Sequence, residues 1–91
     1  MRYFDSLEPY LDFIASRSPK NAAIVGDAIA AAVKLLPENP TLGSVFDDDL
    51  PDHRKLIVKE TTVVYYRVTD EIVELLEVAH VRLNRDTLRF D

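Results

Sequence analysis

The chain is short and acidic, and its composition is that of one ordinary globular domain. It has 91 residues, of which 47% are hydrophobic and 30% charged, which excludes a disordered or fibrous chain. It contains no cysteine, so disulfides and thiolate chemistry are excluded as well. The formal net charge of -5 argues against direct nucleic-acid binding, because proteins that bind phosphate carry basic surfaces.

Nothing in the sequence predicts a membrane partner. No apolar run approaches the roughly 18 residues of a membrane span, and the first residues do not resemble a signal peptide. We therefore expect a cytoplasmic protein, with residues 1–91 forming a single domain.

The first half of the chain is predicted to form two helices. Ser6 is a favourable N-cap, and the apolar residues after it recur at helical spacing. Ser18 and Pro19 give a second start signal, and a second apolar stripe follows until Pro37 ends the helix. Because the link between the helices is very short, we expect an antiparallel helical hairpin over residues 6–36.

The second half of the chain has the composition of β-strands. A loop is predicted over residues 37–53, followed by a meander over residues 54–83 and a tail over residues 84–91. The fold class is therefore α+β, a helical hairpin packed on a small antiparallel three-stranded sheet. The predicted strands are residues 54–59, 62–68 and 72–83.

The last predicted strand is apolar on both faces. The helical hairpin covers only one face of the sheet, so another segment of this chain, a second copy or a foreign partner must cover the other. Strict alternation places Ile72, Leu76, Val78 and His80 on one face, and Val73, Leu75, Ala79 and Val81 on the other.

Several short motifs follow one another along the chain. They are the Ser18-Pro19 break before an alanine-rich helix, Pro40-x-x-Gly43, Arg54 at the head of the strands, Tyr66-Arg67-Val68, and Val78-x-His80. In this order the motifs resemble the RelE/ParE family of bacterial toxins. The resemblance implies a toxin of a type II toxin-antitoxin pair, in which a cognate antitoxin folds part of itself onto the toxin surface.

One departure from the family concerns the N-terminus. Family members usually begin with a β-strand, whereas only residues 1–5 precede the first predicted helix here. An edge of the sheet then lacks a partner, which predicts strand addition by the antitoxin or a homodimer through the sheet edge or the exposed sheet face. The alternative is a shortened, inactive toxin-like domain that only binds.

The resemblance leaves two activities open. ParE-like members poison DNA gyrase by binding it, whereas RelE-like members cleave mRNA on the ribosome and need a base, an acid and cations around the phosphate. The acidic composition, and Phe90 where such nucleases often carry tyrosine or histidine, favour the first activity. We therefore expect a non-enzymatic gyrase inhibitor, as in plasmid stabilisation, that the antitoxin neutralises. Nuclease candidates would be Arg54, Lys59, Arg67, His80 and Arg82.

Several other residues are candidates for binding, metal or structural roles. Asp47, Asp48 and Asp49 are adjacent and cannot all converge on one ion, so neither a metal nor another cofactor is expected. Tyr65 and Tyr66 point to opposite faces, which predicts that at most one joins the core. The family resemblance implies that Tyr66 is structural. The candidates for contact with a protein partner are Arg54, Tyr65, Arg82, Arg85 and Arg89.

Overall fold

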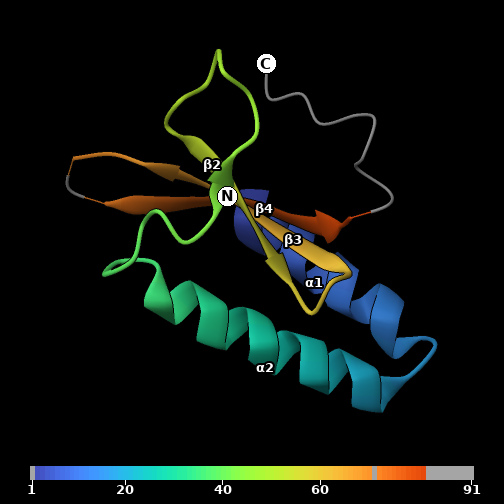
Figure 1. Cartoon of the computed structure of the whole chain (residues 1–91). Coiled ribbons are helices and arrows are strands. Elements are labelled where there is room, and N and C mark those ends of the chain that lie inside the picture. Colours follow the sequence, from blue (N-terminus) through green and yellow to red (C-terminus); the bar gives the residue numbers. More distant parts are fainter. Residues whose placement is uncertain (1, 71, 82–91) are drawn as a thin grey trace.

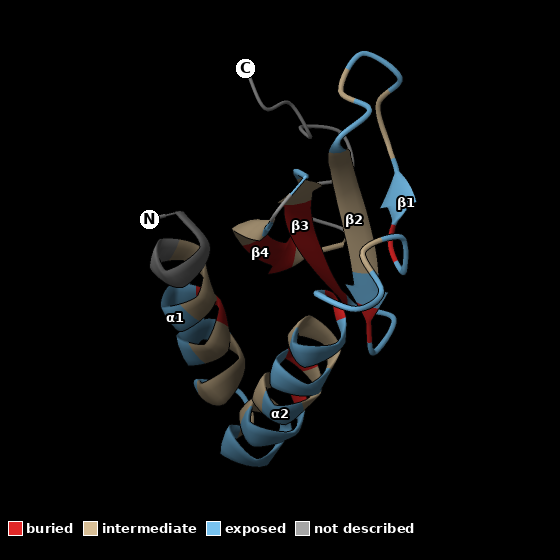
Figure 2. Cartoon of the chain, turned by 90° about the vertical axis from the view of Figure 1, so that its left-hand side faces the viewer, coloured by how far each residue is buried: buried red, intermediate tan, exposed pale blue. Residues whose placement is uncertain are grey.

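The computed structural model describes residues 2–70 and 72–81, which form two helices followed by an antiparallel sheet (Figure 1). The sheet has four strands in the order β1-β2-β3-β4, and both helices lie on one of its faces (Figure 2). This confirms the α+β class, with one short strand added inside the predicted loop. The elements are α1 (Arg2–Ala15), α2 (Pro19–Leu35), β1 (Ser44–Val45), β2 (His53–Val58), β3 (Thr62–Val68) and β4 (Val73–His80).

The two helix starts differ in how well the sequence predicted them. Ser18 caps α2 as expected, because its hydroxyl accepts the Asn21 N–H at 3.1 Å. The prediction of Ser6 as a cap was wrong, since α1 begins at Arg2 and includes Ser6. The Ser6 hydroxyl instead accepts the Val78 N–H at 2.9 Å. This serine therefore satisfies a donor of the sheet.

That hydrogen bond lies at the edge of the sheet formed by β4. In the part of the chain that the structure describes, no strand precedes α1, and α1 packs against β4. Unpaired backbone groups on an edge strand are a template for a further strand. Because Ser6 engages the Val78 N–H, the edge is less open than the sequence predicted. Strand addition and a homodimer at this edge remain predictions.

The main core lies between the helices and the sheet. Tyr10 from α1, Val25 and Ile29 from α2 and residues from all three long strands form one buried cluster. Each such aliphatic side chain contributes roughly 1.5–3 kcal/mol by leaving water. The strand members of this cluster are Val58, Val64 and Val78.

A β-bulge changes which side chains of β4 face the helices. The pairing of β3 with β4 shifts by one residue, and Leu76 is the extra residue. Leu75 therefore packs with Val78 against the helices, while Leu76 packs with Ala79 on the opposite face. The strict alternation expected from the sequence was wrong, because one inserted residue reverses the faces of everything before it.

The outer face, which is the face of the sheet away from the helices, carries a second buried cluster around Tyr65. Phe46, just after β1, packs edge-on against Tyr65 with ring centroids 5.4 Å apart. Tyr65 is 1% exposed and Tyr66 0%, so the expectation that only one tyrosine joins the core was wrong. Each is buried on its own face. A segment of the same chain therefore covers part of the outer face.

The turn between β2 and β3 is conformationally strained. Lys59 and Glu60 have φ angles of 55° and 65°, a region that costs L side chains energy but suits glycine. We expect Glu60→Gly to raise the free energy of unfolding by about 0.5–1 kcal/mol in urea denaturation. Thr61→Gly is the matched control, because Thr61 lacks a positive φ and glycine there should destabilise. Equal effects of the two substitutions would contradict this explanation.

Candidate partner-binding site

Four residues of the family pattern meet around one buried tyrosine hydroxyl. The Tyr66 hydroxyl donates to the Pro40 carbonyl oxygen at 2.7 Å and accepts the Gly43 N–H at 2.8 Å. Arg54 Nη1 donates to the Gly43 carbonyl oxygen at 2.7 Å. These bonds fasten the segment between α2 and β1 to strands β2 and β3. Because Tyr66 is fully buried, water competes little with them.

Gly43 is required in this network because the backbone of β2 runs close beside it. A side chain at this position would overlap the Lys55 carbonyl oxygen, and its Cβ would lie 2.8 Å from the Tyr66 hydroxyl. Only glycine permits such a close approach of two backbone segments. The Pro40-x-x-Gly43 motif is therefore explained by packing against β2 and β3.

The fastened segment forms one wall of an apolar pocket of about 410 Å³. Pro37 and Pro40 line this wall, and the turn between β3 and β4 forms the other. We call this pocket the proline pocket. Its other lining residues are Val68, Thr69, Asp70, Ile72 and Val73.

Hydrogen bonds also fix the second wall of the proline pocket. The Thr69 N–H donates to the Ile72 carbonyl oxygen at 2.9 Å, and the Ile72 N–H donates to Thr69 Oγ1 at 3.2 Å. Both walls are thus held before any partner arrives, which lowers the entropy cost of binding.

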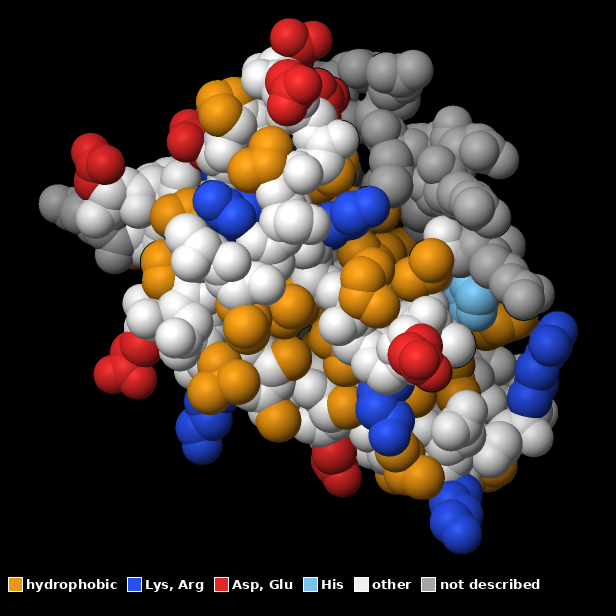
Figure 3. All heavy atoms as spheres, in the orientation of Figure 1, with side chains coloured by type: hydrophobic (Ala, Val, Ile, Leu, Met, Phe, Trp, Pro, Cys, Tyr) orange, Lys and Arg blue, Asp and Glu red, His pale blue; other side chains and the backbone are white. Residues whose placement is uncertain are grey.

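Exposed apolar side chains surround this region. Ile72 is 60% exposed, and Leu35 and Leu42, at either end of the segment that carries Pro37 and Pro40, are 53% and 49% exposed. Figure 3 shows apolar side chains gathered on the side of the molecule that α2 and β2 present. Large exposed apolar side chains gathered on one side of a protein are typical of protein-protein contact sites.

The structure does not bring the described nuclease candidates to one point. Arg54 pairs with Tyr66 across β2 and β3, and the next cross-strand pair contains Arg67. Because successive pairs alternate between the faces of a sheet, the two arginines lie on opposite faces. Lys59 and His80 lie at the other end of β3, beside Thr62, about 17 Å away at the rise of an extended strand. Arg82 lies outside the described residues.

Arg67 forms a surface ion pair across the sheet. Its Nη2 lies 2.6 Å from Glu74 Oε1, and the two side chains are 43% and 44% exposed. Exposed pairs of this kind contribute about 0–1 kcal/mol. An ion pair between neighbouring strands therefore accounts for Arg67 without a catalytic role.

The candidates for partner contact are placed differently from one another. Arg54 is committed in part to Gly43, Tyr65 is buried, and Arg82, Arg85 and Arg89 lie outside the described residues. The pocket residues Pro37 and Ile72 were missed by sequence reasoning. Their only sequence signal is an apolar residue beside a turn or a proline, which many core positions share.

The described residues contain no set of three or more acidic, histidine or cysteine side chains placed to hold a metal ion. In the aspartate-rich loop, Asp47 Oδ1 instead accepts the Asp49 N–H at 2.9 Å, a local turn contact. Neither described helix has the length and apolar character needed to cross a bilayer.

Tyr65 gives the sheet a measurable dependence on alkaline pH. Burial, and then the negative charge of Glu77, raise the pKa of Tyr65 to about 12. The folded protein holds this proton more tightly than the unfolded chain, whose tyrosines titrate near pH 10. The associated stability is therefore complete below about pH 10 and is lost as pH rises toward about 12.

We expect the free energy of unfolding to fall more steeply between about pH 10 and 12 in the wild type than in Tyr65→Phe. The difference between the two curves removes the contribution of lysines and other tyrosines. Chemical denaturation at several pH values across this range measures the free energy of unfolding of both proteins. Parallel curves would show that Tyr65 titrates as an ordinary exposed tyrosine.

Comparison with protein families matches residues 5–84 to the model described as ParE toxin of type II toxin-antitoxin system, parDE. The matched range includes all four strands, the network around Tyr66 and the proline pocket. No curated protein matches the chain. Since the match spans most of the sequence, the chain belongs to the ParE toxin family and is the toxin of a type II toxin-antitoxin system, with a cognate antitoxin as its partner.

Proposed function

We propose that this toxin acts by binding and inhibiting DNA gyrase, and that its antitoxin neutralises it by covering the binding surface. The observation that carries the proposal is the proline pocket, whose two walls are fixed by the hydrogen bonds of Tyr66 and Thr69. An inhibitor without chemistry depends on a preorganised contact surface with an apolar anchor point. The pocket and the exposed Ile72 supply such a point.

The spread of the polar candidates supports binding over RNA cleavage. Cleavage through a ribose hydroxyl needs a base and cations within hydrogen-bond reach of one phosphate. Arg54 and Arg67 lie on opposite faces, and His80 lies at the far end of the sheet. Ribosome-dependent mRNA cleavage and an inactive, shortened toxin remain the competing outcomes of the test.

The test adds purified protein to a gyrase supercoiling assay. The wild type should inhibit supercoiling, and Ile72→Lys should lose most of the inhibition, because a charge at the pocket must be desolvated on binding. Ile57→Lys is the matched control. Ile57 is also exposed, at 47%, but lies on the outer face of β2, away from the pocket.

Thermal melts of both variants establish that they fold. Normal supercoiling at high molar excess of wild-type toxin would refute the target. Cleavage of mRNA on translating ribosomes would support the RelE-like alternative. Unimpaired growth after induction without the antitoxin would support an inactive domain.

A further inference from the structure

The outward side of α2 carries a pattern suited to a second copy of this chain. Val25 and Ile29 face the core, while Ile24 and Leu35 are 42% and 53% exposed. Figure 2 shows exposed residues along the side of α2 that faces away from the sheet. Large apolar side chains left exposed on a regular helix indicate a partner when they share one stripe.

These side chains form two neighbouring rows on the helix. Ile24, Ala31 and Leu35 follow at intervals of seven and four residues and lie on one stripe. Asp27 and Lys34 are both exposed, are seven residues apart and form the row beside it. The small alanine in the middle permits another helix to approach to about 8–10 Å.

We propose that two copies associate through antiparallel α2 helices around a two-fold axis between Ala30 and Ala31. In this register Asp27 of each copy faces Lys34 of the other, so the ion pair occurs twice. Ile24 then lies beside the second copy's Leu35, offset by about 3 Å along the axis at 1.5 Å per residue. A two-fold contact requires such a self-complementary surface.

The charges favour this register over a symmetric register centred on Asp27. Centring the axis on Asp27 would set the two Asp27 carboxylates against each other. It would also set Lys20 against the second copy's Lys34. Like charges facing each other disfavour an arrangement even where the apolar contacts are similar. The charge pattern therefore favours the register centred between Ala30 and Ala31 over the one centred on Asp27.

A single pair of helices buries less than the roughly 1,200–2,000 Å² of a stable standard interface. We therefore expect a weak dimer, with a dissociation constant of about 10–100 µM. The inference does not depend on the target of the toxin. It also differs from a dimer through the sheet edge, because β4 takes no part in it.

Sedimentation velocity from about 5 to 500 µM tests the proposal. The wild type should pass from monomer to dimer over this range. Lys34→Asp and Asp27→Lys should each weaken association about tenfold, since each reversal acts twice across the axis. The combined Asp27→Lys and Lys34→Asp variant should restore the wild-type constant.

Lys20→Asp is the matched control, because Lys20 is an exposed lysine of α2 whose opposite position in this register is the uncharged Thr41, beyond the end of the helix. It should leave the constant unchanged. A protein that stays monomeric at the highest concentration overturns the proposal. So does a dimer that tolerates the single reversals, or a double variant that remains as weak as the singles. Because sedimentation uses the toxin alone, failure here is independent of any result with gyrase.

Discussion

Replacing Gly43 with alanine should destabilise the folded toxin by roughly 3 kcal/mol or more. The added methyl group would overlap the Lys55 carbonyl oxygen and crowd the Tyr66 hydroxyl. Neither neighbour moves freely, since one is strand backbone and the other is buried and bonded to Pro40. Relief requires the segment between α2 and β1 to move off the sheet, which breaks the bonds of Tyr66 and Arg54. Urea denaturation measures the loss.

Gly26→Ala is the matched control for this substitution. Gly26 lies within α2, and a Cβ there would meet Leu11 Cδ1 at 3.6 Å, an ordinary contact. Alanine in a helix interior is favoured over glycine by about 0.8–1.0 kcal/mol, so this variant should equal or exceed the wild type in stability. Wild-type stability of Gly43→Ala would show that the segment does not approach β2 as closely as described.

The network around Gly43 shows what a sequence pattern can predict and what it cannot. Pro40, Gly43, Arg54 and Tyr66 were identified as motifs of a resemblance, each with a fixed place in the order of the chain. The order of these motifs does not explain why each position carries the residue it does. The reason is a set of contacts between positions 11 to 26 residues apart, and such contacts depend on the register of the strands.

The N-termini of the two helices show the same limit of what a local sequence pattern can predict. Ser18 was predicted correctly because a cap and its acceptor contact lie three residues apart in one segment. Ser6 has the same local signal, but its partner is Val78, 72 residues away. A local signal cannot reveal that a distant strand edge competes for the hydroxyl. The N-terminal boundary of α1 was therefore missed.

The strands were predicted well and their faces less well. The range of β3 agrees with the prediction, β2 is shifted by one residue, and β4 begins one residue later than predicted and ends at His80. The last two residues of that predicted strand, 82–83, lie outside the described residues. The bulge at Leu76 left no trace in the hydrophobic pattern, because both faces of β4 are apolar and Leu75 and Leu76 are identical. Swapping two leucines between faces changes no property that periodicity measures.

The candidate site was the least predictable part of the molecule. The proline pocket is lined by two prolines from the segment after α2, and by residues from the end of β3 to the start of β4. These residues are Pro37, Pro40, Val68, Thr69, Asp70, Ile72 and Val73. Their meeting follows from the order of the strands and from the hydroxyl of Tyr66. The nuclease candidates were collected by residue type, and only the register shows that Arg54 and Arg67 face opposite ways. The sequence shows which side chains are chemically suitable for a site, but it does not show which of them lie close together.

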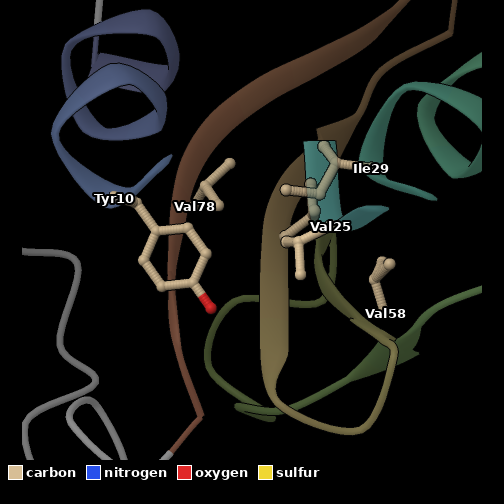
Figure 4. Close-up of a cluster of buried hydrophobic side chains, with 6 residues drawn as sticks. Tyr10, Val25, Ile29, Val58 and Val78 are labelled. Atoms are coloured by element: carbon tan, nitrogen blue, oxygen red, sulfur yellow. The ribbon is translucent and has the colours of Figure 1, made fainter. Parts of the chain in front are cut away.

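The second large effect is expected where α1 joins the sheet through two buried hydroxyls. The Tyr10 hydroxyl and Thr62 Oγ1 lie 2.7 Å apart, and Thr62 is fully buried. Figure 4 shows Tyr10 reaching from α1 across β4, beside Val78. Tyr10→Phe or Thr62→Val each removes one partner and leaves the other in an apolar cluster. Each should lower the free energy of unfolding by about 1–3 kcal/mol.

The combined Tyr10→Phe and Thr62→Val variant should recover most of that loss. A hydrogen bond between neutral groups contributes only about 0.5–1.5 kcal/mol net, because water bonds to both groups in the unfolded chain. The larger cost of each single variant comes from stranding one hydroxyl, and the double variant strands none. Urea denaturation of the wild type, both single variants and the double variant gives the coupling energy directly. Strictly additive losses would mean that the two hydroxyls stabilise the toxin through separate contacts, and that the link between α1 and β3 depends on the packing of the Tyr10 ring.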